Sequence, residues 1–368
     1  MSLHMRHIPA VMILTSLMSS ISWGVQPEMR SVTLDDPSLN YLGIRYVDAQ
    51  PDAVSFSRFN PELLLLGKPE LGFNPDKAKN TTGGVIAFQT DSPTVRLKFH
   101  PTAGMNRGSE FGVFMDGRYV ESYKFSPKQQ ELDIEITNKK GGASAFWELT
   151  LPSFANPELV LFEIEKQSQL TSKSGQIPEK VYVAIGDSIT HGTGQGSATH
   201  LTWPYILSRK LGFTLFNLAV GGSGVSVTAG QSLAAFDRVD LVTILIGYND
   251  WNGEGDSAQH FQDQYLELLK AIRANHPETP IFCISPLVTR REISRTSSLP
   301  IDGFRAAVRQ LEQELSTSDP NIHFIPGESI SSTANLRADK PDDPVHLGIA
   351  GAAMLAESVF PLITKEIQ

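Results

Sequence analysis

Residues 181–194, VYVAIGDSITHGTG, set a continuous apolar run directly against Gly186, Asp187 and Ser188. A short apolar run that ends at a turn residue is typical of a strand buried on both faces of a parallel sheet. A turn explains the glycine and the aspartate, but it does not require a serine. Whether the Ser188 hydroxyl is a chemical group or only a polar one therefore decides what the protein does.

The pattern that begins at residue 181 continues to the end of the chain. The apolar runs VYVAIG, TLFNLAV, LVTILIG and IFCIS alternate with amphipathic helical patterns such as FQDQYLELLKAIRANH and GFRAAVRQLEQELS. This alternation predicts a three-layer α/β/α domain over residues 181–368, with a parallel sheet between two helical layers. Such sheets bind ligands beyond the carboxyl ends of their strands. We expect the loops GDS, NLAVGGSG and GYND, which follow the first three strands, to meet there.

The preceding part of the chain reads as all-β. Residues 25–165 contain short, partly alternating runs such as TVRLKFH, ELDIEIT and AFWELTL, which are separated by turn residues and not by helical patterns. Asp116 and Gly117 lie between two apolar-rich arms and predict a two-residue hairpin turn. These features predict an N-terminal β-sandwich or jelly-roll accessory domain. Residues 166–180 are polar and predict a linker.

The first 24 residues differ in kind from the rest. A basic start at Arg6 and His7 precedes an apolar segment, and Ser22 and Gly24 supply the small residues of a cleavage site. This pattern predicts a signal peptide and a secreted or periplasmic protein, with an uncleaved N-terminal anchor as the alternative. The leading MSLH, before a second methionine, resembles a cloning remnant. No later segment is apolar for long enough to span a membrane.

Composition narrows the classes of partner. The net charge of −9 comes without any run of lysine or arginine, which argues against nucleic acid as a partner. Cys283 is the only cysteine, so no disulfide forms within the chain, and its apolar surroundings predict a core thiol. The histidines show no metal-ligand spacing, and the glycines at 192–196 lack the lysine of a phosphate loop. We therefore expect no metal and no cofactor.

The C-terminal segment supplies the partners that a nucleophilic serine needs. Asp343 precedes His346 by three residues in DDPVHLG, so a turn can bring the carboxylate to one ring nitrogen. The other nitrogen is then available to Ser188, with His346 as general base and then general acid. Asp342 is an adjacent rival to Asp343 with a less suitable spacing.

Acyl transfer also requires donors for the negative charge that develops on the carbonyl oxygen. The candidates are the backbone N–H of Ser188, the backbone N–H of Gly222 in NLAVGGSG, and the side-chain amide of Asn249 in GYND. Gly221 and Gly224 compete with Gly222 for this role. The sequence therefore predicts an oxyanion hole with contributions from three separate loops.

Several residues near these motifs have alternative interpretations. Ser188 could serve only as a helix N-cap, and Asp187 and Asp250 are expected to hold their loops. His191 could be a rival base, but it lacks an orienting partner and is expected to line the substrate pocket. Trp251 and Asn252, just beyond GYND, are further candidates for the pocket lining.

Together, these residues resemble the SGNH, or GDSL-type, hydrolase family. GDSIT, NLAVGGSG, GYND and DPVH match its four blocks in order, at Ser188, Gly222, Asn249 and His346. The resemblance implies a flavodoxin-like α/β/α fold, and the β-rich first half is similar to two-domain carbohydrate acetylesterases. Pro344 stands where the family often has glycine, which implies a different turn at Asp343.

The motifs and the resemblance together predict a serine esterase. The expected substrates are small acyl esters, above all acetyl groups on carbohydrate. One alternative is an acyltransferase that passes the acyl group to a sugar hydroxyl with the same triad. Another is a noncatalytic glycan-binding protein on this scaffold. A lipase is disfavoured because no long apolar lid segment is evident.

Overall fold

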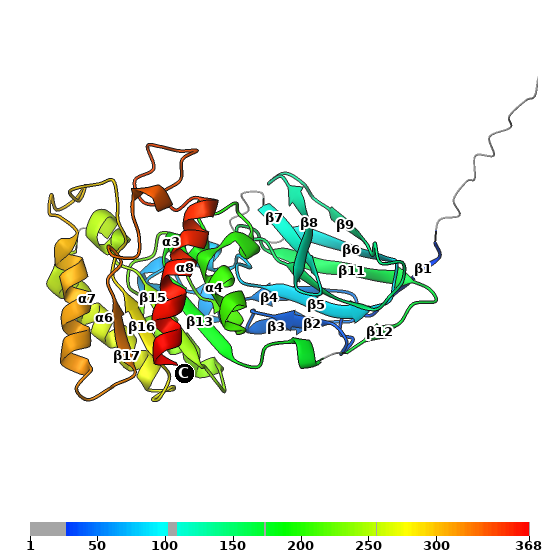
Figure 1. Ribbon diagram of the computed structural model, residues 1–368, viewed down its shortest axis with the longest axis horizontal. Helices are drawn as coiled ribbons and strands as arrows, with labels where there is room; N and C mark the ends of the chain where they lie inside the picture. Colours follow the sequence, from blue (N-terminus) through cyan, green and yellow to red (C-terminus); the bar gives the residue numbers. More distant parts are fainter. Residues whose placement is uncertain (1–26, 102–108, 173, 255, 368) are drawn as a thin grey trace, which may run out of the picture.

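The computed structural model describes residues 27–101, 109–172, 174–254 and 256–367. The predicted signal peptide, residues 1–24, lies outside these ranges. Figure 1 shows an antiparallel β-region beside a second region in which helices surround a parallel sheet. Among the described residues, none of the helices combines the length and the apolar character that a bilayer crossing requires.

The C-terminal domain is built on a five-stranded parallel sheet with the order β14-β13-β15-β16-β17. The strands are β13 (Val181–Gly186), β14 (Thr214–Asn217), β15 (Leu241–Leu245), β16 (Ile281–Ile284) and β17 (Ile322–Ile325). The chain leaves β13 toward one edge and returns to β15 on its other side, which is the flavodoxin-like order. All residues of β15 and β16 are buried, as expected for strands covered on both faces.

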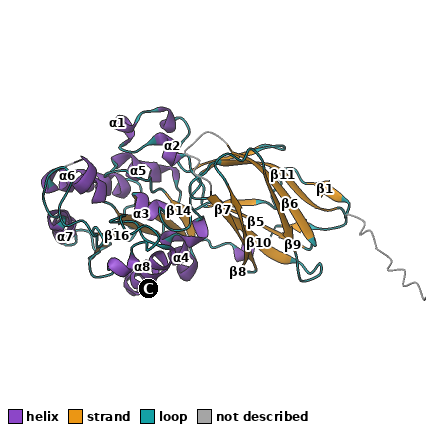
Figure 2. Ribbon diagram, turned by 90° about the horizontal axis from the view of Figure 1, so that it is seen from above, coloured by secondary structure: helices purple, strands orange, loops and turns teal. Residues whose placement is uncertain are grey.

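Helices cover both faces of this sheet. Figure 2 shows α4 and α8 on one side and α5 and α6 on the other, and α7 packs against α6. The helices of this domain are α3 (Ser188–His191), α4 (Trp203–Leu211), α5 (Val227–Gln231), α6 (Ala258–Arg273), α7 (Asp302–Leu315) and α8 (Ile349–Glu366). Short helical turns are η3 (Thr199–Leu201), η4 (Ser232–Ala235), η5 (Asp250–Glu254) and η6 (Thr333–Asn335). The predicted α/β/α architecture is confirmed.

The N-terminal region forms two six-stranded antiparallel sheets that pack face to face. One contains β1 (Met29–Ser31), β3 (Tyr46–Ala49), β4 (Val54–Ser57), β6 (Thr94–Pro101), β9 (Leu132–Thr137) and β11 (Pro157–Glu165). The other contains β2 (Asn40–Leu42), β5 (Val85–Thr90), β7 (Ser109–Met115), β8 (Arg118–Phe125), β10 (Ala145–Thr150) and β12 (Leu170–Thr171). Buried and exposed residues alternate along β9, as in a strand with one face on a core. The β-sandwich prediction is confirmed.

Local chemistry explains where the first half agrees with its sequence pattern and where it differs. Asp116 and Gly117 have φ of 50° and 76° and join β7 to β8 in the predicted two-residue turn. The expected absence of helices is wrong, because η1 (Leu63–Leu65), α1 (Lys68–Leu71) and α2 (Pro75–Ala78) lie in this half. The side chain of Asn74 caps α2, and Pro75 occupies its first turn.

Some residues of the N-terminal half belong to the core of the C-terminal domain, beside a separate core inside the sandwich. Phe59, Leu71 and Phe73 belong to the same buried cluster as the residues of the parallel sheet. On β10, Trp147 faces the core of the sandwich, whereas Phe146 faces the C-terminal domain. Residues 166–180 are also not a free linker, since they contain β12, which pairs with β5, and η2 (Ser174–Gln176). Part of the N-terminal half is therefore packed into the domain that carries the predicted site, although the sandwich keeps a core of its own.

Candidate active site

Ser188 lies at the carboxyl edge of the sheet, directly after β13. Asp187 ends the strand and caps α3, because its Oδ1 accepts the N–H of Ile189 at 2.9 Å. Ser188 is thus the first residue of the helix and not its cap, so the N-cap interpretation of this serine is wrong. Its side chain lines a pocket of about 210 Å³.

The structure brings together the three residues predicted as a triad. His346 Nε2 lies 2.8 Å from Ser188 Oγ, although 158 positions separate the two residues. His346 Nδ1 lies 3.0 and 2.9 Å from the two carboxylate oxygens of Asp343. Because a carboxylate only accepts, Nδ1 carries the proton and Nε2 accepts from the serine hydroxyl. This hydrogen-bond chain has the geometry that activates a serine.

Hydrogen bonds fix the loop that carries Asp343, although Pro344 in this loop has no N–H to donate. Asp343 Oδ1 accepts the N–H groups of Val345 and His346, both at 3.2 Å. Arg290 donates from Nη1 to the Asp343 carbonyl at 2.8 Å and from its backbone to the Pro344 carbonyl at 2.8 Å. The rival Asp342 is exposed to solvent. The turn through Pro344 therefore presents Asp343, and not Asp342, to the imidazole.

The electrostatics of the pair keep the histidine ready to accept a proton. Burial lowers the pKa of His346, and the hydrogen bond and charge of Asp343 only partly offset this effect. Burial raises the pKa of Asp343, but the hydrogen bonds from the ring and backbone of His346 outweigh it and leave that pKa below its ordinary value. At neutral pH, the pair is therefore a neutral imidazole beside a carboxylate.

These shifts predict the acid limb of the pH profile. If His346 is the general base, kcat/KM follows its neutral fraction and falls only below the histidine pKa, with a midpoint under about 6.5. Burial also raises the pKa of the neighbouring Asp187 to about 7, so this group titrates in the same range. The profile of Asp187→Asn, which keeps the capping oxygen, isolates the histidine step. A midpoint above 7 in both proteins would contradict the assignment.

Ser188, Gly222 and Asn249, the three predicted oxyanion donors, all line this pocket. Gly222 adopts a φ of +82°, which is favourable for glycine, and lines the pocket. Within the described part of the chain, neither the Ser188 N–H nor the Gly222 N–H donates to another residue. Gly221 donates instead to His191 Nδ1 at 3.2 Å, and Gly224 does not line this pocket. Gly222 is therefore the better placed of the three competing glycines.

Asn249 completes this arrangement from the loop after β15. Its Nδ2 donates to the Ser223 carbonyl at 2.9 Å, which fixes the orientation of the amide. The same nitrogen lies 3.5 Å from Asp187 Oδ2. One amide hydrogen is used by Ser223 and the other makes only the long bond to Asp187, so an anion in the pocket that Asn249 lines can compete for the second hydrogen.

The expectation that His191 lines the pocket is wrong. The imidazole is fully buried, and its Nε2 lies 2.8 Å from the Ser153 carbonyl. Its ring stacks on Phe154 with centroids 4.7 Å apart. Since the Gly221 N–H occupies Nδ1, both ring nitrogens are engaged. His191 supports the glycine loop from behind and is not a rival base for Ser188.

Trp251 and Asn252 also lie outside the pocket lining, contrary to expectation. The indole of Trp251 is fully buried and donates to the Leu299 carbonyl at 2.8 Å. Asn252 Oδ1 accepts the N–H of Arg295 at 3.1 Å. Both side chains point into the protein because the chain after GYND forms η5, which packs the 250–254 segment against the 294–299 loop. Their role is to hold loops together.

Sequence reasoning missed several residues that do line the pocket: Lys77, Phe154, Thr193, Tyr248 and Val345. Lys77 and Phe154 come from the N-terminal half. Neither lies in a motif that suggests catalysis, so nothing in the sequence connects them with Ser188. Tyr248 and Val345 lie inside the GYND and DPVH blocks, and their neighbours could have suggested them.

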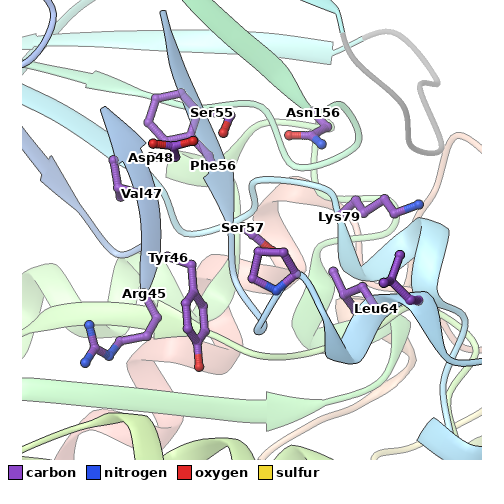
Figure 3. A pocket seen from close by; sticks show the side chains of 12 residues that line it. Arg45, Tyr46, Val47, Asp48, Ser55, Phe56, Ser57, Leu64, Lys79 and Asn156 are labelled. Carbon is purple, nitrogen blue, oxygen red and sulfur yellow. The ribbon is translucent and has the colours of Figure 1, made fainter. Parts of the chain in front are cut away.

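Two larger cavities help to define the site. A cleft of about 670 Å³ borders the pocket and shares Phe154 and Thr193 with it, and Arg337 and Asp339 lie on its wall. A groove of about 540 Å³ lies on the β-sandwich along β3 and β4 (Figure 3). This groove contains none of the predicted site residues. The smaller pocket is therefore the candidate active site, and the cleft is its natural extension.

Comparisons with known proteins bear on the family and the fold. Residues 184–354 match the GDSL-like Lipase/Acylhydrolase family. A search of curated protein sequences returns no match.

Solved structures share the whole architecture, at identities that establish the fold alone. A salicylyl-acyltransferase from a tetracycline biosynthetic pathway has 22% identity and a TM-score of 0.79, over 92% of this chain and 97% of its own. A family two carbohydrate esterase from Cellvibrio japonicus has 12% identity and a TM-score of 0.67, over 93% and 99%. An acetyl xylan esterase from Butyrivibrio proteoclasticus has 10% identity and a TM-score of 0.64, over 92% and 98%. These structures share the fold, and over residues 184–354 this chain matches the GDSL-like lipase/acylhydrolase family.

Proposed function

We propose that the protein is a serine esterase that hydrolyses small acyl esters, acetyl above all, on carbohydrate. The observation that carries the proposal is the His346 imidazole, which contacts Ser188 Oγ through one nitrogen and Asp343 through the other. A noncatalytic binding protein would not need this hydrogen-bond chain. The similarity to family two carbohydrate esterases supports a sugar as the alcohol.

Acylation uses the groups that line the pocket. His346 Nε2 takes the Ser188 proton as Oγ attacks the ester carbonyl carbon. The carbonyl electron pair moves onto the oxygen, where Gly222 N–H, Ser188 N–H and Asn249 Nδ2 stabilise the charge. The tetrahedral intermediate then collapses, the bond to the alcohol oxygen breaks, and His346 returns the proton to that oxygen. Ser188 is left acylated.

Deacylation repeats the sequence with water. His346 removes a proton from a water molecule, whose oxygen attacks the acyl carbon. The second tetrahedral intermediate collapses, the bond to Ser188 Oγ breaks, and Oγ recovers the proton from His346. Asp343 stays ionised and stabilises the imidazolium in both halves. Every step uses protein groups and water, so the proposal includes no cofactor.

The cavities favour a small acyl group on a large alcohol. The pocket at Ser188 has a volume of only about 210 Å³, and the apolar parts of Phe154, Tyr248 and Val345 line it. The adjoining cleft is about three times larger and has charged groups on its wall. We infer that the acyl group occupies the pocket and that the alcohol extends into the cleft.

This arrangement predicts a strong dependence on acyl length. Across nitrophenyl acetate, butyrate and octanoate, kcat/KM should fall by at least about tenfold from acetyl to octanoyl, because a pocket of this small volume discriminates against added methylenes. Release of acetate from acetylated oligosaccharides, absent in Ser188→Ala, tests the sugar assignment. Equal or faster hydrolysis of the octanoyl ester would contradict the small pocket and favour a lipase.

Acyl transfer to a sugar hydroxyl is the second candidate function. The similarity to a salicylyl-acyltransferase over most of both chains supports acyl transfer as a candidate function. Both reactions pass through the same acyl-enzyme and differ only in whether water or a hydroxyl attacks it. Incubation with a nitrophenyl ester and excess sugar, with free acid and sugar ester measured separately, distinguishes them.

A further inference from the structure

The peptide that joins Gly221 to Gly222 is held at both of its polar ends. Its N–H belongs to Gly222, which lines the pocket, and is the proposed oxyanion donor. Its carbonyl, on Gly221, accepts a hydrogen bond from Lys77 Nζ at 2.9 Å. A Cβ built on Gly222 would lie 3.2 Å from the same Nζ. The Lys77 ammonium therefore lies against the peptide that presents the donor.

The physics of the peptide unit links these two contacts. The carbonyl and the N–H belong to one rigid plane and point in opposite directions. An ammonium that donates to the carbonyl oxygen forms a charge-assisted bond, which fixes the plane and hence the direction of the N–H. The ammonium also draws electron density toward the carbonyl oxygen, which polarises the N–H of the same peptide. In a chain of linked hydrogen bonds, this polarisation strengthens each bond by about 10–30%. The Gly222 N–H thus becomes a better oriented and stronger donor.

The rest of the glycine loop is anchored by other residues of the N-terminal half. Arg58, which follows β4, donates from Nη1 to the carbonyls of Asn217 at 2.6 Å and Ala219 at 2.7 Å. Its Nη2 donates to the Lys77 carbonyl at 3.2 Å. The guanidinium is only 2% exposed, and burial lowers its pKa to about 9, so it remains charged at neutral pH. One buried cation therefore aligns the glycine loop with α2, which carries Lys77.

We propose that Lys77 is a positioning residue that orients and polarises the Gly221–Gly222 peptide for oxyanion stabilisation. This inference rests on the proposed esterase function and assigns part of the catalytic apparatus to the N-terminal half. Lys77 lines the pocket, but its Nζ is bound to the Gly221 carbonyl, and the proposed role acts through that peptide. Its loss should therefore affect the transition state more than substrate binding.

The experiment compares Lys77→Met with a matched control, Lys79→Met. Lys79 lies two residues further along, lines the separate groove of Figure 3 and pairs with Asp76 at 3.0 Å. With nitrophenyl acetate, Lys77→Met should lower kcat about 10- to 100-fold, less than the about 10²–10³ expected for loss of a whole donor. KM should change by less than about threefold, and Lys77→Arg should recover much of the loss, because its guanidinium can also donate. Lys79→Met should match the unsubstituted protein.

A second readout reports on the oxyanion site without turnover. Phenylboronic acid forms a tetrahedral adduct with an active serine, and its inhibition constant should rise in Lys77→Met by a factor similar to the loss in kcat. Thermal unfolding of all variants shows whether the fold is retained. If Lys77→Met fails to fold, the milder Lys77→Gln and Lys77→Arg variants carry the same comparison.

The outcomes separate this inference from the proposed function. An unchanged kcat in a folded Lys77→Met protein, alongside an inactive Ser188→Ala protein, would overturn the inference and leave the esterase intact. A raised KM with unchanged kcat would also overturn it, since it would make Lys77 a substrate-binding residue. An unsubstituted protein that neither hydrolyses esters nor binds the boronate would instead refute the proposed function.

Discussion

Replacement of Ser188 by alanine should lower kcat for nitrophenyl acetate by at least about 10⁴-fold, because the acyl-enzyme can no longer form. The substitution removes only the oxygen that lies 2.8 Å from His346 Nε2, at the first position of α3. The backbone N–H groups and Asn249 remain, so a small residual rate and near-normal substrate binding should persist. Initial rates and the inhibition constant of a non-hydrolysable ester analogue measure the two effects.

Covalent labelling gives the matched control for this prediction. A fluorophosphonate should add to the unsubstituted protein at Ser188 alone, as located by peptide mass spectrometry, and should not label Ser188→Ala. Ser329→Ala, which removes an exposed serine that does not line the pocket, should keep full activity and labelling. Substantial ester hydrolysis in a folded Ser188→Ala protein would show that another group is the nucleophile.

The second large effect is expected at the carboxylate that holds the histidine. Asp343→Asn should lower kcat/KM by about 10³–10⁴-fold, because an amide can donate to Nδ1 and so favour the imidazole tautomer that cannot accept from Ser188. The carboxylate also opposes the effect of burial on the pKa of His346, so its loss should lower the histidine pKa further. Rate measurements from pH 5 to 9 separate the two effects. The wrong imidazole tautomer lowers the rate at every pH, whereas a lower His346 pKa moves the midpoint of the acid limb.

Asp342→Asn is the natural control, since it makes the same change one residue earlier. Asp342 is exposed, whereas Asp343 accepts two backbone N–H bonds and both imidazole contacts. Asp342→Asn should therefore remain within about twofold of full activity, as is usual for surface substitutions. An equal loss in both variants would mean that the charge of the loop matters and not the contact with His346.

Some parts of the site could be predicted from the sequence because the chemistry is local. The strand before Gly186 is buried on both faces, and parallel strands place their following loops at one edge, so the encounter of Ser188, Gly222 and Asn249 follows from connectivity. The spacing of Asp343 and His346 similarly implies a turn that joins them. In each case, a short segment or a regular element determines where the side chain lies.

Other assignments failed because burial depends on distant segments. Trp251 and Asn252 follow a motif that faces the pocket, yet the 294–299 loop covers them and turns both residues into structural anchors. His191 follows the nucleophile by three residues, but Phe154 and Ser153 from the other half enclose its ring. Amphipathic patterns do not reveal which surface of a turn another part of the chain will cover.

The sequence by itself determined the α/β/α and β-sandwich classes, the order of the motif blocks and the types of residue that meet at the carboxyl edge of the sheet. These follow from periodicity and short-range turn chemistry, which each segment carries alone. Only the tertiary structure decided that the N-terminal half contributes Phe59 to the core of the C-terminal domain, Arg58 to the glycine loop and Lys77 to the pocket. The physical reason is that Arg58 and Lys77 bind backbone carbonyls more than a hundred residues away in the sequence. No local sequence pattern indicates such a contact.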